Sequence, residues 1–220
     1  MITSAVGPAP KYVELPETRA AQTRLLVVDD HAAVRAGLRD LLEDEGDFDV
    51  VAAVASAEAA MSIAEREPID VAVVDYQLGR RNGLWVSRKL KRLPSPPAVL
   101  IYSAYADGVL AAAAVVAQAD AIVSKGGLGS ELCDQIRRVA RGHSGMRPMP
   151  AWLGDTIRSR FGHQEQAVFG MLLAGIESGK IAATLGLSEA GLESRLWAML
   201  HKLEAPHSEY RVADVAGDAG

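Results

Sequence analysis

The feature that most constrains the fold of this chain is an alternation of short apolar runs with segments of helical spacing. Short, nearly continuous apolar runs are typical of strands that are buried on both faces of a parallel sheet. Helical periods separate these runs, and the alternation predicts an α/β fold with a five-stranded doubly wound parallel sheet and helices on both faces. The five runs are Leu25–Val28, Val50–Val54, Val71–Val74, Ala98–Ile101 and Ala121–Val123.

The strand pattern ends before the C-terminal third of the chain. Residues 142–150 (GHSGMRPMP) are rich in glycine and proline and have no apolar period, which indicates a linker. Beyond them only helical patterns occur, over residues 164–174, 178–185, 189–203 and 209–216. We therefore predict a small all-α domain after the sheet domain. The expected divisions are a disordered leader (1–22), the sheet domain (23–141), a linker (142–160) and the helical domain (161–220).

Composition narrows the functional classes. A formal net charge of -5 argues against a protein that coats nucleic acid by bulk electrostatics. The single cysteine, Cys133, has no partner within the chain for a disulfide, so nothing suggests an oxidising compartment. The longest purely apolar run, Val109–Ala117, is far shorter than the roughly 20 residues of a membrane span. Residues 1–22 lack the pattern of a secretory signal. We expect a cytoplasmic protein without membrane contact.

Polar side chains follow the predicted strands at the point where each strand ends. Asp29 and Asp30 follow the first strand, Asp75 the third, Ser103 the fourth and Lys125 the fifth. Ligands of open parallel sheets bind beyond the carboxyl ends of the strands, so these groups are expected to share one edge. Carboxylates gathered there repel one another unless a cation is present, and Mg²⁺ prefers such oxygen ligands. The set predicts phosphoryl transfer onto an aspartate.

Each of these residues also has an ordinary structural interpretation. Asp30 could cap the first helix, and Asp75 could end its strand in a turn. Lys125 could be a surface charge and Ser103 a strand-end hydroxyl. The prediction therefore depends on all five residues following the right strands in the right order. His31, beside Asp30, is expected to face solvent at the start of the first helix and not to act in acid–base catalysis.

The motifs LLVVDDH, VVDYQLG, IYSAY and IVSK carry a resemblance to a known family. Residues 24–141 resemble the receiver domain of two-component response regulators, which are not independent enzymes. The resemblance implies that Asp75 is the phosphoacceptor and that a sensor histidine kinase is the phosphoryl donor. It also implies that Mg²⁺ is held by Asp29, Asp30 and Asp75 together with the backbone carbonyl of Gln77.

One position departs from that family. Receiver domains usually relay phosphorylation through a residue at the position of Ser103 and an aromatic residue three positions before the lysine. Here Ile122 stands three residues before Lys125. Isoleucine has no hydroxyl and no flat ring to reorient, which puts the usual relay in doubt. Tyr102 and Tyr105 flank Ser103 and are alternatives, although either could be ordinary packing.

The segment KIAATLGLSEAGLESRLWAMLHKL is typical of two helices joined by a tight turn, with Ser188 as the N-cap of the second. Residues 163–216 resemble the four-helix DNA-binding domain of LuxR/NarL/FixJ-type regulators. The resemblance implies that the third helix enters the major groove and that the fourth supports a homodimer. The predicted buried stripe of the third helix is Leu192, Leu196, Met199, Leu200 and Leu203. The candidate DNA contacts are Ser188, Glu193, Ser194, Arg195, Trp197 and Lys202.

The charge of this helical region agrees less well with DNA binding. From residue 151 onward it has six basic and nine acidic residues. Glu193 stands where the family typically presents a lysine, and a carboxylate repels phosphates although it can accept a hydrogen bond from cytosine. Trp197 could equally pack against a neighbouring helix. Arg195 and Lys202 are better candidates for phosphate contacts.

Three hypotheses follow. The first is a homodimeric transcription regulator that is phosphorylated on Asp75 and binds promoter DNA. The second, which Ile122 and the acidic recognition helix motivate, is an atypical regulator controlled by protein partners, oligomerisation or a small ligand. The third, which Glu193, Trp197 and the local negative charge allow, is a C-terminal module that binds protein and no DNA.

Overall fold

The computed structural model describes residues 22–104, 107–146 and 153–203. Most of the expected leader (residues 1–21) and the helix expected over residues 209–216 lie outside these ranges. The strands are β1 (Thr23–Val28), β2 (Phe48–Val54), β3 (Val71–Asp75), β4 (Gln77–Leu78), β5 (Arg81–Asn82), β6 (Ala98–Ser103) and β7 (Ala121–Ser124). The helices are α1 (Ala32–Asp44), α2 (Ala57–Ala64), α3 (Gly83–Leu90), α4 (Gly108–Val116), α5 (Gly129–Ala140), α6 (Leu153–Arg160), α7 (His163–Leu173), α8 (Ser178–Thr184) and α9 (Glu189–Leu203).

Five strands form one parallel sheet in the order β2-β1-β3-β6-β7. All five are the strands predicted from the apolar runs, so the predicted five-stranded doubly wound sheet is confirmed. The strand order changes direction at β1, and β3 lies at the centre between β1 and β6. The carboxyl ends of β1, β3 and β6 consequently stand side by side. Strands β4 and β5 are a separate short antiparallel hairpin between β3 and α3.

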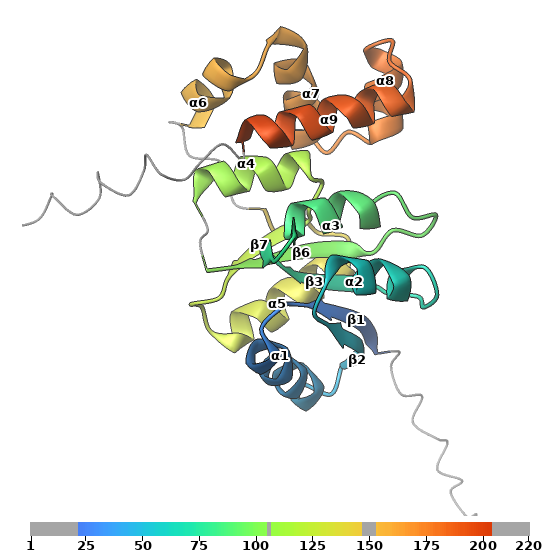
Figure 1. The fold of residues 1–220 in the computed structure, drawn as a ribbon, viewed down its shortest axis with the longest axis vertical. Helices are drawn as coiled ribbons and strands as arrows, with labels where there is room; N and C mark the ends of the chain where they lie inside the picture. The colour runs from blue at the N-terminus through green and yellow to red at the C-terminus, as the bar shows by residue number, and fades with distance from the viewer. Residues whose placement is uncertain (1–21, 105–106, 147–152, 204–220) are drawn as a thin grey trace, which may run out of the picture.

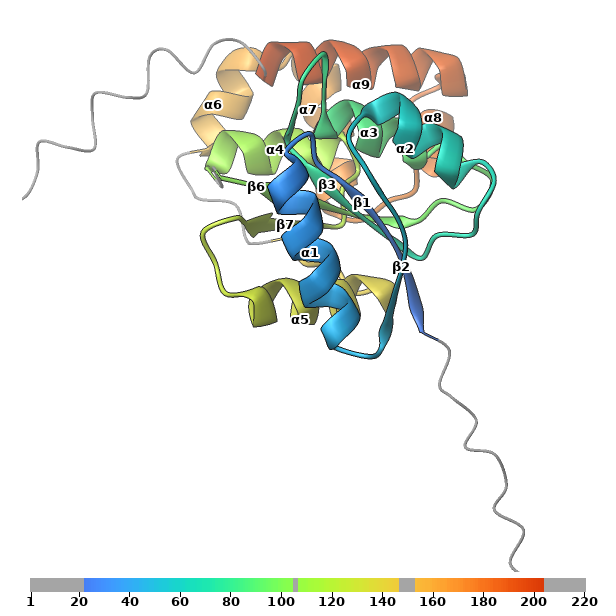
Figure 2. The ribbon, with the colours of Figure 1, turned by 60° about the horizontal axis from the view of Figure 1, so that its bottom comes forward.

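The two faces of the sheet carry different helices (Figures 1 and 2). Helices α1 and α5 cover one face, where Leu42 and Ile136 pack with Leu25 and Val73 in one buried cluster. Helices α2, α3 and α4 cover the other face. The alternation of buried side chains along each strand therefore supplies two apolar layers, as expected for a doubly wound sheet.

Helices α6 to α9 form a second helical unit against α4 (Figure 1). The stripe predicted for the helix at residues 189–203 is buried at all five positions, which confirms that assignment. Residues 153–160 were expected to be part of the linker, but they form α6. Leu153 and Ile157 are buried there, and Phe161 meets Phe169 edge to face with ring centroids 5.7 Å apart. The connection between the domains is therefore shorter than expected.

Helix α4 explains the alanine-rich apolar run of the sequence. Six of its nine residues are buried, because the sheet covers one side and helices α7 and α9 pack on the other. A helix that is apolar all round is stable only when it is buried all round. Within the described part of the chain, no helix is both long and apolar enough to span a membrane.

Candidate phosphoacceptor site and output helix

The polar residues at the strand ends converge as the sequence predicted. Asp29, Asp75 and Ser103 follow or end β1, β3 and β6, and all three are buried. Lys125 follows β7, and its backbone N–H donates to the Ser103 carbonyl at 2.7 Å. The parallel register places Asp75 beside Tyr102, so the acceptor candidate lies one residue from the end of β6.

Lys125 is the cation that pairs with the carboxylates of this edge, while Arg35 of α1 donates to the Asp29 backbone carbonyl at 2.7 Å. Its Nζ lies 2.6 Å from Asp29 Oδ2 and 2.8 Å from Asp75 Oδ2. The Asp29 and Asp75 side chains are 1% and 4% exposed, whereas Lys125 retains 20%. Asp29 is held further because its Oδ1 accepts the backbone N–H of His31 at 2.8 Å. One lysine thus faces two buried carboxylates, and a third carboxylate, Asp30, stands beside them.

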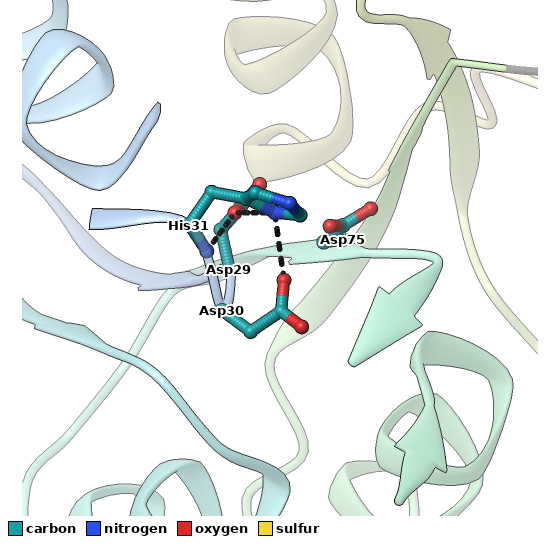
Figure 3. Close-up of side chains that lie close together, drawn as sticks. All are labelled: Asp29, Asp30, His31 and Asp75. Atoms are coloured by element: carbon teal, nitrogen blue, oxygen red, sulfur yellow. Dashed lines mark hydrogen bonds and ion pairs between the residues drawn. The ribbon is translucent and has the colours of Figure 1, made fainter. Parts of the chain in front are cut away.

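Asp30 and His31 are the more exposed members of the cluster, and Figure 3 shows them beside Asp29. The His31 Nδ1 lies 2.7 Å from Asp30 Oδ1 and 3.4 Å from Asp29 Oδ1. The imidazole is 67% exposed, as expected for a residue at the start of α1. Its contact with the Asp30 carboxylate was not foreseen, because adjacency in sequence does not fix the direction of a side chain.

Burial and hydrogen bonding affect the pKa values of Asp75 and Lys125 differently. Burial raises the pKa of the Asp75 carboxyl, and the hydrogen bonds from Lys125 and the Gln77 backbone only partly oppose that rise. Burial alone would lower the pKa of the Lys125 ammonium, but its hydrogen bonds to Asp29 and Asp75 outweigh burial and raise the pKa. The lysine therefore stays charged, while ionised Asp75 gains from any further cation.

The donor atoms suit a hard divalent cation. One ligand atom from each of Asp29, Asp30, His31 and Asp75 lies within 4.8 Å of the others. Gln77, proposed from the resemblance to add a backbone carbonyl, follows Asp75 by two residues, and its N–H donates to Asp75 Oδ1 at 3.1 Å. Oxygen donors predominate, which is the set that Mg²⁺ takes in proteins, and the excess of carboxylates over Lys125 leaves charge for a cation to balance.

The fold and the residues at the carboxyl edge of the sheet define the class of protein. A five-stranded parallel sheet with a buried central-strand aspartate, a second buried aspartate and a pairing lysine is the arrangement of a receiver domain. The model of the response regulator receiver domain family matches residues 25–137, which is more than half of the chain. The chain belongs to that family and is a response regulator.

Two curated relatives match most of the chain. The DNA-binding transcriptional activator DevR/DosR of Mycobacterium tuberculosis is 30% identical over 190 residues, which cover 82% of this chain and 88% of the relative. The response regulator UvrY of Escherichia coli is 25% identical over 205 residues, covering 87% and 92%. Because both alignments extend past the receiver domain, the likeness includes the C-terminal helices.

Solved structures agree with this assignment. A LuxR-family response regulator from Aurantimonas is 29% identical with a TM-score of 0.55, and covers 58% of this chain and 91% of its own. The response regulator RcsB, solved in complex with DNA, has a TM-score of 0.55 over 83% of this chain and 92% of its own. At 19% identity, RcsB supports the fold alone.

The position that is usually aromatic in receiver domains makes an aliphatic contact here. Ile122 pairs with Ile101 across the sheet and packs against the apolar cluster on the α4 face. Tyr102 instead lies toward the site, where Lys125 Nζ stands 5.6 Å from its ring centroid. Tyr105, the other aromatic alternative, is outside the described residues. An aromatic ring therefore lies near Lys125, but it belongs to Tyr102 of β6 and not to a residue of β7.

The candidate DNA contacts all lie on or next to α9, but they differ in surroundings. Ser188 caps the helix, since its Oγ accepts the Gly191 N–H at 3.0 Å. Ser194 is exposed and Trp197 is half-buried against the apolar cluster. Arg195 Nη1 donates to Gln164 Oε1 at 2.5 Å, and Lys202 Nζ bonds Glu165 at 2.6 Å. These polar partners lie on α7.

Glu193 points elsewhere. Its carboxylate forms an ion pair with Arg88 of α3, whose side chain is 3% exposed, and it lies 3.6 Å from Arg92. The same Arg88 donates to Gln118, which in turn donates to Ser178 Oγ at 2.7 Å. These contacts join the receiver domain to α8 and α9. Sequence reasoning missed them because no local pattern encodes the placement of two domains.

Proposed function

We propose that this protein is a two-component response regulator whose phosphorylation on Asp75 controls DNA binding by its C-terminal helices. The observation that carries the proposal is the meeting of Asp75 with Asp29, Asp30 and Lys125 at one edge of the sheet. A buried aspartate that pairs with a lysine and lies among further carboxylates is suited to phosphoryl transfer, whereas a stable fold does not require this arrangement.

The residues divide the chemistry among them. A carboxylate oxygen of Asp75 attacks phosphorus, and the bond from phosphorus to the donor imidazole nitrogen of a sensor histidine kinase breaks. Lys125, 2.8 Å from the acceptor oxygen, neutralises charge on the arriving phosphoryl group. The buried Ser103 hydroxyl stands at the end of the adjacent strand and is proposed to bond a phosphoryl oxygen.

Mg²⁺ is the proposed cofactor. Asp30, Asp75 and the Gln77 carbonyl would hold it, with Asp29 beside them. When bound, Mg²⁺ supplies positive charge for the phosphoryl oxygens. Asp29 meanwhile keeps Lys125 oriented, because its two oxygens are already bonded to Lys125 and to the His31 N–H.

The output is proposed to be transcription regulation by a cytoplasmic homodimer at promoter DNA. Relatives that match across most of the chain include a DNA-binding transcriptional activator. The helices α8 and α9, with the tight turn at Gly186 (φ 65°), have the geometry of a helix-turn-helix pair. Ser188, Ser194, Arg195, Trp197 and Lys202 are the proposed contacts, and Glu193 joins them only when α9 leaves Arg88.

The test is phosphoryl labelling of the full chain. Wild type incubated with acetyl phosphate and Mg²⁺ is expected to gain a phosphoryl group that is detected by phosphate-affinity electrophoresis. Asp75→Asn keeps the shape of the side chain and should lose the label entirely, whereas Asp134→Asn on the exposed side of α5 should keep it. Equal labelling of wild type and Asp75→Asn would refute the assignment.

A second candidate rests on Ile122. An atypical regulator would bind DNA in the same way whether or not Asp75 is modified, under the control of a protein partner or a small ligand. Wild type, Asp75→Asn and Asp75→Glu would then have the same affinity for DNA in a binding titration. A labelled wild type with changed affinity would exclude this candidate.

A further inference from the structure

Tyr102 lies at the same edge of the sheet as Asp75, on the face that α1 and α5 cover. It is the last residue but one of β6, and the parallel register pairs it with Asp75 of β3 and with Val123 of β7. Tyr102 packs with the apolar cluster under α1 and α5, whereas Ile122 packs with the cluster on the α4 face. The Tyr102 ring therefore lies on the other side of the sheet from position 122.

The phosphoacceptor points to the same face as Tyr102. Val73, two residues before Asp75 on β3, belongs to the cluster against which Tyr102 packs. Side chains alternate between the faces of a sheet, so Asp75 shares this direction. Lys125 Nζ lies 2.6 Å from Asp29 Oδ2 and 2.8 Å from Asp75 Oδ2. It also lies 5.6 Å from the centre of the Tyr102 ring. The ammonium thus has two carboxylates as partners and one aromatic ring as a neighbour.

The ring attracts the ammonium electrostatically. The face of an aromatic ring carries negative charge density, which attracts a cation within about 6 Å of the ring centre. The Lys125 side chain is only 20% exposed, so solvent screens this attraction less than it would at a free surface. Burial raises the pKa of the Tyr102 hydroxyl, although Lys125 opposes the rise. The ring is therefore neutral at ordinary pH and does not act as a third anion.

Lys125 must change partners during phosphoryl transfer. An Asp75 oxygen forms the bond to phosphorus, while the bond from phosphorus to the leaving group of the donor breaks and its electron pair stays with that group. The lysine keeps its protons and turns from the carboxylate to a phosphoryl oxygen. Lysine has a flexible stem, and Gly126 and Gly127 follow it in the chain, so the adjacent backbone offers little restraint. Asp29 and the Tyr102 ring are neighbours that strands β1 and β6 hold in place.

We propose that Tyr102 is a positioning residue for phosphoryl transfer, and that its ring holds the Lys125 ammonium beside the acceptor while the lysine turns from the Asp75 carboxylate to the phosphoryl group. This inference rests on the proposed function. The ring acts on the lysine and not as a relay to α4, because it lies on the opposite face of the sheet. The hydroxyl is not needed, so a phenyl ring at position 102 suffices.

Phosphorylation rates of variants at position 102 test the proposal. The full chain is incubated with Mg²⁺ and a series of acetyl phosphate concentrations, and labelling is followed by phosphate-affinity electrophoresis. Tyr102→Leu is expected to lower the maximal rate constant about three- to tenfold, with little change in the half-saturating concentration, because the ring does not contact the donor. Tyr102→Phe should stay within about twofold of wild type. The control Trp85→Leu removes a ring that contacts Arg81 and Lys89 instead, and should keep the wild-type rate.

A ring of reversed polarity separates attraction from packing. Pentafluorophenylalanine at position 102 has nearly the shape of phenylalanine, but its fluorine atoms make the face of the ring positive. It is expected to be as slow as Tyr102→Leu, and it keeps the test valid if that variant fails to fold. A rate equal to that of Tyr102→Phe would overturn the proposal. In NMR spectra, the ring-current shift of the Lys125 Cε protons should persist in Tyr102→Phe and disappear in Tyr102→Leu.

The double variant Tyr102→Leu, Ile122→Tyr separates positioning from relay. It returns an aromatic residue to the usual position on the α4 face and is expected to stay as slow as Tyr102→Leu. Recovery of the wild-type rate would overturn the proposal. Wild type that gains no label would refute the proposed function and this inference with it. Equal labelling rates for wild type and Tyr102→Leu would overturn the inference alone and leave the phosphoacceptor in place.

Discussion

Two ion clusters of this molecule have opposite charge balances. At the edge of the sheet, one lysine stands among three carboxylates, and two of these carboxylates are almost fully buried. At the domain contact, one glutamate stands between two arginines. The first cluster has an excess of negative charge, which attracts a small cation or a cation-bound phosphoryl group. The second has an excess of positive charge, and its carboxylate belongs to a helix of the other domain.

The two clusters differ in whether their charged groups can separate while the protein stays folded. The groups around Lys125 are fixed by strand ends of one sheet, so they cannot separate unless the domain unfolds. Arg88 and Glu193 belong to separate domains, so they can separate while each domain stays folded. We therefore expect the same kind of interaction to be structural in one place and reversible in the other, and the following predictions test that contrast.

The largest effect is expected for Lys125→Met. Asp29 and Asp75 would remain buried without a cation, which should lower the free energy of unfolding by about 3 to 5 kcal/mol. Urea denaturation measures this loss, and added Mg²⁺ should recover part of it. Lys180→Met removes a lysine whose side chain is 74% exposed and should cost less than about 0.5 kcal/mol. Similar losses of unfolding free energy for Lys125→Met and Lys180→Met would contradict the structural role assigned to the ion pairs of Lys125.

A smaller loss is expected for Arg88→Met. Glu193 would lose its buried partner, but undocking of α9 lets the carboxylate reach water, so we expect about 1 to 2 kcal/mol. Urea denaturation followed by tryptophan fluorescence and by circular dichroism measures this value. A loss as large as that of Lys125→Met would mean that the domains cannot separate, and the reversible contact would be ruled out.

Binding of Mg²⁺ should stabilise the sheet edge alone. At a free concentration ten times the dissociation constant, the free energy of unfolding should rise by about 1.4 kcal/mol in wild type. Asp30→Asn removes one proposed ligand and should abolish most of this gain, whereas Asp134→Asn, whose site is 72% exposed on α5, should keep it. Thermal denaturation across a Mg²⁺ series measures the effect, and an equal gain in all three proteins would place the cation elsewhere.

The smallest effect is expected at a surface cluster. Arg137 on α5 contacts Glu45 at 2.6 Å and Asp47 at 2.8 Å, and its hydrogen bond holds the pKa of Asp47 below the ordinary value. Arg137→Gln should cost about 1 kcal/mol or less at neutral pH, since both carboxylates are well solvated. A lowered pKa contributes stability above the unfolded value of 3.8 and loses it as the pH falls through the folded value. Urea denaturation of both proteins should therefore converge in acid, and a difference that widens would reverse the assigned sign.

Much of the receiver domain could be predicted because its information is local. Each strand is a short apolar run, and each polar residue at the site follows one of those runs within two residues, so the order of strands brings Asp75 near Asp29 and Lys125. The buried stripe of α9 was predictable for the same reason. Periodicity within one element fixes which side chains face the core.

The unpredicted features depend on contacts between elements. Helix α6 follows a region of glycine and proline and has few apolar residues of its own, and Leu153 and Ile157 are buried in the same apolar cluster as the core residues of α7 and α9. The Arg88–Glu193 pair depends on how two domains meet, and the His31 contact depends on a side-chain direction. None of these is encoded by spacing within a single element.

Gln118 combines an unusual backbone conformation with a side-chain contact between the two domains. Of the described residues, it is the only non-glycine with a positive φ, 58°, at the end of α4. Glycine would adopt this conformation without the cost that a side chain incurs there. Yet the Gln118 amide is the bridge between Arg88 and Ser178, and glycine would remove it. A glycine at this position would therefore relax the backbone and remove a contact between the two domains, so the local conformation and the domain contact favour different residues here.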